Sequence, residues 1–210
     1  MENKYLRLAR EARAEDNSED AKKYYDMVRT DDPTNGEAKF FYAYYALHEG
    51  KNGEIALRFE NLCKVVAPSI ARVADSELSQ EEKIDIVGSI TDAFVPSAWD
   101  LNRYMNNLTV GTGADRTRVL DTSHLISVCK NGIATNYALG DAIEKHFSGN
   151  KKAMEFACKA WKEGISLQQK WYAYGTKGDP EKYAAKVQKY DPSYEMPKKA
   201  GCITLADKKN

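Results

Sequence analysis

A helical hairpin that recurs along the chain is the feature that most constrains its fold. Residues 5–33 contain two runs in which apolar residues recur at three- and four-residue steps, as on one face of a helix. A polar turn separates the two runs, and Pro33 closes the second. When the sequence is shifted by 35 residues, residues of the same kind coincide: Ala21 with Ala56, Tyr24 with Phe59, and Pro33 with Pro68. The pattern predicts an all-α protein built from antiparallel helical hairpins.

Local signals predict where the helices of the first hairpin begin and end. One helix is expected over about residues 2–14, and a second begins at Asn17 and Ser18, which are residue types that cap helix N-termini. Asp32 ends the second helix, because the residue before a proline is disfavoured in the helical conformation. The second hairpin repeats this order and is expected to end at Pro68.

The central part of the chain keeps the helical period and loses the repeat. Ser79 with Glu82 forms a capping-box pattern that predicts a helix start. Pro96 is expected to interrupt that helix, and residues 109–113, which contain two glycines, are expected to form a loop. A long helix or helix pair then extends to a break at 148–150. No alternating pattern typical of a strand is present.

A third hairpin is predicted near the C-terminus. A shift of 159 residues again makes similar residues coincide: Leu8 with Leu167, Val28 with Val187, and Asp32-Pro33 with Asp191-Pro192. Because 159 is not a multiple of the repeat length, we interpret the central helices as a different kind of insertion. The predicted organisation is one compact unit with four parts: two hairpins over 1–70, a central helical bundle over 71–150, a C-terminal hairpin over 151–196, and a flexible tail over 197–210.

The first hairpin resembles the tetratricopeptide repeat (TPR), a helix–turn–helix unit of 34 residues. Six residues occupy positions of the family's pattern: Tyr5, Leu8, Ala9, Ala21, Tyr25 and Pro33. Two positions depart from it, because Ala12 replaces an aromatic residue and Glu15-Asp16 replaces the turn glycine. The resemblance covers about residues 2–68 and, more weakly, about 160–193, and it does not include the central region.

The composition of the chain limits the classes of partner that it is expected to bind and the cellular compartment in which it is expected. Of 210 residues, 31 are Lys or Arg and 31 are Asp or Glu, so the formal net charge is zero. A nucleic-acid-binding domain is normally basic, which argues against that class. No apolar run approaches the length of a membrane span and no signal peptide precedes the first helix, so we expect a cytoplasmic protein with no membrane contact. Four widely spaced cysteines fit free thiols in a reducing compartment.

No group of residues predicts catalysis, a metal site or a cofactor site. His48, His124 and His146 have no second ligand at helical spacing, and no Cys-x-x-Cys motif occurs. Cys129 lies on a different helical face from His124, and its apolar neighbours predict a buried, inert thiol. Residues 110–113 lack the Gly-Lys-Ser/Thr ending of a phosphate-binding loop. We therefore expect a protein that is not an enzyme and that holds no cofactor.

The resemblance implies where a partner would bind. Tetratricopeptide arrays hold partner segments on a concave face lined by the first helix of each unit. The family's contact positions fall on seven residues of this chain: Asn3, Leu6, Arg10, Arg13, Phe41, Tyr45 and His48. Arginines form forked contacts with carboxylates and aromatic residues are common interface anchors, so the expected partner is an acidic or mixed protein segment. Alternatively, Arg10 and Arg13 only pair with local acids such as Glu2 and Glu11.

The leading functional prediction is therefore a non-enzymatic interaction or scaffold module. Two alternatives stay open at this stage. The chain could be a self-assembling structural subunit, with a homodimer as one form, or residues 70–150 could form a ligand-binding or enzymatic helical bundle. Under the leading prediction, replacing Arg10 and Arg13 by glutamate abolishes partner capture and leaves the chain folded.

Overall fold

The protein is α-helical throughout the part that the structure describes. The structure is a computed structural model, and it describes residues 3–49, 54–110, 122–171 and 178–198, without the side chains of 102–110 and 122. Eight helices and no strand occur in these ranges, which confirms the predicted all-α class. The helices are α1 (Lys4–Ala14), α2 (Ser18–Asp31), α3 (Gly36–Leu47), α4 (Ile55–Asp75), α5 (Gln80–Val110), α6 (Thr122–Phe147), α7 (Lys151–Trp171) and α8 (Pro180–Tyr190).

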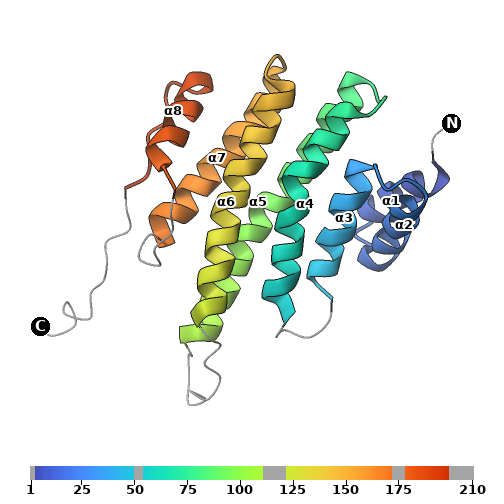
Figure 1. The fold of residues 1–210 in the computed structure, drawn as a ribbon, viewed down its shortest axis with the longest axis horizontal. Coiled ribbons are helices and arrows are strands. Elements are labelled where there is room, and N and C mark those ends of the chain that lie inside the picture. The colour runs from blue at the N-terminus through green and yellow to red at the C-terminus, as the bar shows by residue number, and fades with distance from the viewer. Residues whose placement is uncertain (1–2, 50–53, 111–121, 172–177, 199–210) are drawn as a thin grey trace, which may run out of the picture.

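The described helices pair into hairpins that follow one another across the molecule, from α1 and α2 at one end to α8 at the other (Figure 1). Within the hairpins, α1 packs on α2, α3 on α4, α5 on α6, and α7 on α8. Between hairpins, α2 packs on α3, α4 packs on α6, and both α5 and α6 pack on α7. This order is compatible with a helical repeat whose units differ in length.

Asparagine and aspartate side chains begin several of these helices, because they satisfy backbone N–H groups that have no partner inside the helix. Asn17 accepts a hydrogen bond from the N–H of Asp20, as the sequence predicted. Asn3, Asn35 and Asp179 cap α1, α3 and α8 in the same way. The Asp-Pro pairs at 32–33 and 191–192 end α2 and α8, which confirms both predicted helix ends.

The predicted helix ends at the two interior prolines are wrong. Pro68 lies inside α4 and Pro96 lies inside α5, and both helices continue beyond them. An interior proline removes one backbone hydrogen bond and costs roughly 3 kcal/mol. Burial after each proline offsets that cost, because Ile70 and Val73 follow Pro68 in the core and Leu101 follows Pro96.

The helices of the central region are longer than the sequence pattern predicted. The predicted boundary at residue 70 falls inside α4, which extends to Asp75. The predicted loop at 109–113 begins too early, because Thr109 and Val110 are the last residues of α5, and 111–113 lie outside the described residues. The region between 122 and 147 is one helix, α6, and the predicted break at 148–150 separates it from α7.

One apolar core extends through the stack. Its largest fully buried side chains come from α2, α3, α4, α5 and α7: Tyr25, Phe40, Phe41, Phe59, Phe94 and Trp161. Among the described helices, none combines the length and the apolar character that crossing a membrane requires. The shared core explains why the hairpins form a single unit, since each hairpin buries an apolar face against the next.

The turn between α4 and α5 is held by the capping box that the sequence predicted. The Ser79 N–H and hydroxyl donate to Glu82 Oε2 at 3.0 and 2.6 Å, and the Glu82 N–H donates to Ser79 Oγ at 3.3 Å. We expect Ser79→Ala to lower the free energy of unfolding by about 1 kcal/mol, because the first turn of α5 loses its cap. Urea denaturation followed by circular dichroism measures this change, and Ser79→Asp, which restores an oxygen acceptor, should recover most of it.

Candidate functional site

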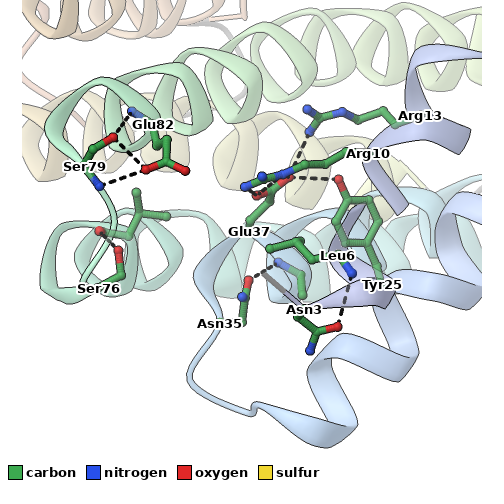
Figure 2. A network of polar contacts seen from close by, with 12 residues as sticks. Asn3, Leu6, Arg10, Arg13, Tyr25, Asn35, Glu37, Ser76, Ser79 and Glu82 are labelled. Carbon is green, nitrogen blue, oxygen red and sulfur yellow. Dashed lines mark hydrogen bonds and ion pairs between the residues drawn. The ribbon is translucent and has the colours of Figure 1, made fainter. Parts of the chain in front are cut away.

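A buried carboxylate lies at the centre of the first three helices. Glu37, in the first turn of α3, is only 2% exposed. Arg10 of α1 donates to it through Nε at 3.1 Å and Nη2 at 2.6 Å. Arg13 Nη1 lies 3.6 Å from Glu37 Oε1, and the Tyr25 hydroxyl of α2 donates to the same oxygen at 3.0 Å (Figure 2). The network therefore joins α1, α2 and α3.

The charge of Glu37 requires these partners. A carboxylate without them would be costly to bury, and two guanidinium groups together with a position in the first turn of a helix compensate it. Burial raises the pKa of the Tyr25 hydroxyl, and the nearby Glu37 charge raises it further. The hydroxyl consequently stays protonated and serves as a hydrogen-bond donor to Glu37.

The sequence allowed two interpretations of Arg10 and Arg13, partner binding or pairing with local acids, and neither named Glu37 as their main partner. Glu11, one of the local acids considered, pairs instead with Arg7 at 2.6 Å in an exposed i,i+4 contact, and Glu2 lies outside the described residues. Glu37 was not among the candidates, because it is 27 residues away from Arg10 in sequence. An acid in the first turn of a predicted helix is a weak signal for such a pair, since it is equally typical of an exposed helix start.

Aromatic rings extend from this network along α3. The Arg13 guanidinium lies 4.3 Å from the centre of the Phe41 ring. Tyr44 contacts Tyr45 at a ring separation of 5.3 Å and His48 at 5.7 Å. The structure therefore places basic residues of α1 next to aromatic residues of α3.

The seven predicted contact residues differ in how much of each side chain a partner could reach. Leu6 and Phe41 are 7% and 2% exposed, so their side chains belong to the core. Asn3 is half-buried and caps α1. Arg10 and Arg13 retain side-chain exposures of 29% and 28% while paired with Glu37. Tyr45 is half-buried and His48 is exposed, which makes them the most accessible aromatic positions of the set.

A groove of about 1030 Å³ adjoins the Glu37 network. It lies between the N-terminal ends of α1 and α3 and the turn that joins α4 to α5 (Figure 2). Leu6, Val73, Leu78 and Ile86 supply its apolar lining. The α4–α5 side of the groove was not predicted, although the Ser79–Glu82 capping box located the turn that forms it.

A smaller groove of about 550 Å³ lies beside His48. Tyr44 and His48 line it from α3, and Pro96 and Leu101 line it from α5. Both grooves are therefore bordered by α3 and α5 on the side of the stack that includes the predicted contact positions. No sequence pattern predicted that α5 would border these positions, because that depends on how the hairpins stack.

Burial affects the thiols of two of the described cysteines. Burial raises the pKa of the Cys63 and Cys129 thiols to about 12, so both are protonated at neutral pH, as predicted for Cys129. Within the described residues, no group of three or more His, Cys, Asp or Glu side chains could hold a metal ion.

Comparisons with protein-family models, with curated proteins and with solved structures found no match. The fold and the grooves described above are therefore the basis for any functional assignment.

Proposed function

We propose that this chain is a non-enzymatic interaction module of the tetratricopeptide type. In this proposal, a partner segment binds along the side of the stack bordered by α1, α3 and α5. The observation that supports it most directly is the position of His48 in the lining of the smaller groove, with Tyr45 in ring contact with Tyr44, which lines the same groove. Concave surfaces between stacked helical repeats are where such proteins hold extended partners.

The division between buried and partly exposed aromatic side chains supports a binding role for the partly exposed ones. The residues that hold the hairpins together, such as Tyr25 and Phe41, are buried. Aromatic side chains that stay partly exposed at the rim of a groove are typical anchors for a partner. Tyr44 and His48 have this position in the groove beside α5.

Self-assembly receives no comparable support from the described surface. The large apolar side chains exposed on it are Met27, at 36%, and Leu57, at 58%, on α2 and α4 respectively. Single exposed apolar residues are ordinary on a soluble surface, whereas a stable dimer buries a contiguous patch.

The double variant Tyr45→Ala with His48→Ala tests the proposal. We expect it to reduce partner capture from a cell lysate at least tenfold, because it removes the exposed His48 side chain from the smaller groove together with the half-buried tyrosine that contacts Tyr44. Affinity capture with the full chain, followed by quantitative mass spectrometry, measures the change.

Tyr24→Ala with His124→Ala is the matched control. It removes the same two residue types from half-buried and exposed positions on α2 and α6. Thermal denaturation of both variants establishes that each is folded before capture is compared. A folded Tyr45→Ala, His48→Ala variant that captures the same proteins as the unmodified chain would show that the proposal is wrong.

A further inference from the structure

We infer that the groove between α1, α3 and the α4–α5 turn receives a positively charged protein segment, one in which Lys or Arg lies next to an apolar side chain. The inference rests on the proposed function and specifies the chemistry of the partner. It reverses the sign of the partner expected from the sequence, which was acidic or mixed. Three features of the groove lead to this result.

The first feature is that the arginines of α1 are already engaged. Arg10 makes a two-pronged contact with buried Glu37, and Arg13 contacts the same carboxylate. An acidic partner would have to compete with a carboxylate that cannot leave, because Glu37 is held within the first turn of α3. Both arginines are thus engaged inside the protein, where Glu37 neutralises one of their two positive charges.

The second feature is the charge of the groove lining. Five carboxylates line the groove, those of Asp32, Glu37, Asp75, Glu77 and Glu82. Two guanidinium groups, from Arg10 and Arg72, accompany them, which leaves a surplus of three negative charges. Asp75, Glu77 and Glu82 are exposed at the rim.

Two of the three rim carboxylates are available to a partner. The hydroxyl and the N–H of Ser79 donate to Glu82 and lower the pKa of its carboxyl. Within the described residues, no ion pair or hydrogen bond engages the carboxylates of Asp75 and Glu77. A cationic side chain that enters the groove therefore meets free acceptors, and opposite charges across an interface steer and orient a partner.

The third feature is the apolar floor beneath this rim. Leu6, Val73 and Ile86 are 2 to 7% exposed, and Leu78 is half-buried in the turn. Lys and Arg bury aliphatic stems against such a surface while their charged ends reach nearby carboxylates. Nucleic acid and anionic lipid surfaces carry phosphate groups that this rim would repel, which favours a protein segment.

Selection of random dodecapeptides, displayed on phage, against the full chain tests the inference. We expect the selected peptides to be enriched in Lys and Arg relative to the starting library. Fluorescence anisotropy then measures the affinity of the labelled peptides for the protein. Affinity should fall when the salt concentration is raised from about 0.05 M to about 0.5 M, because screening weakens contacts between exposed charges.

Charge reversal at the rim separates this groove from the rest of the surface. Asp75→Lys with Glu77→Lys should weaken binding of the selected peptides at least tenfold. Glu15→Lys with Glu195→Lys is the control, since it changes the formal charge by the same amount at two exposed positions that do not line the groove. The control should retain the affinity of the unmodified chain within about twofold.

The possible outcomes distinguish this inference from the function on which it rests. Selection of acidic or uncharged peptides, failure to select any peptide, or equal weakening by both charge-reversed variants would each overturn the inference. If lysate capture still depends on Tyr45 and His48 in that case, the proposed function stands without it. If the Tyr45→Ala, His48→Ala variant also leaves capture unchanged, both are wrong.

Discussion

Replacing Glu37 by alanine is expected to lower the free energy of unfolding by about 3 kcal/mol, because removal of one partner from a buried ion pair leaves the other charges uncompensated. Arg10 and Arg13 would lose the carboxylate they share, and the buried Tyr25 hydroxyl would lose its acceptor. Urea denaturation, monitored by circular dichroism and by tyrosine fluorescence, measures the change.

Glu11→Ala provides the control for this variant. It removes a glutamate of α1 whose ion pair with Arg7 is exposed on both sides. Exposed ion pairs contribute at most about 1 kcal/mol, so the loss should be clearly smaller than for Glu37. Equal effects of the two variants would contradict the central role assigned to Glu37.

The Glu37 network changes the expected effect of replacing Arg10 and Arg13 by glutamate. The sequence led to the expectation that Arg10→Glu with Arg13→Glu abolishes partner capture in a folded chain. In the structure these substitutions would place two further carboxylates beside Glu37, which is 2% exposed. We therefore expect the double variant to destabilise the first hairpin, so that lost capture would not by itself identify a binding surface.

Gly140→Ala is expected to lower the free energy of unfolding by about 2 kcal/mol through overpacking. A Cβ atom at this position of α6 would lie only 2.5 Å from Cδ1 and 2.8 Å from Cε2 of Trp161 on α7. The indole cannot easily move away, because it is fully buried and its Nε1 donates to Asp141 at 3.1 Å. Thermal and urea denaturation of the variant measure the loss.

Gly149→Ala is the matched control for Gly140→Ala. Gly149 lies between α6 and α7, and a Cβ atom there would meet nothing within 4 Å. Its stability should stay within about 0.5 kcal/mol of the unmodified chain. If Gly140→Ala is equally harmless, the close packing of α6 against Trp161 is not as the structure shows.

The sequence by itself determined the helical class and many of the helix ends. The caps at Asn17 and Ser79 and the Asp-Pro stops after α2 and α8 all occur where local residue types predicted them. These features depend on residues within one helical turn, so they can be read without knowledge of the fold.

Only the tertiary structure decided that two helices continue past interior prolines and which charged side chains form ion pairs. Pro68 and Pro96 do not end their helices, because burial of later residues against other hairpins outweighs the local cost. The pairing of Arg10 with Glu37 and the acidic groove beside it join segments from α1, α3 and the α4–α5 turn. Burial and charge pairing between distant segments depend on how the hairpins stack, and no local pattern in the sequence contains that information.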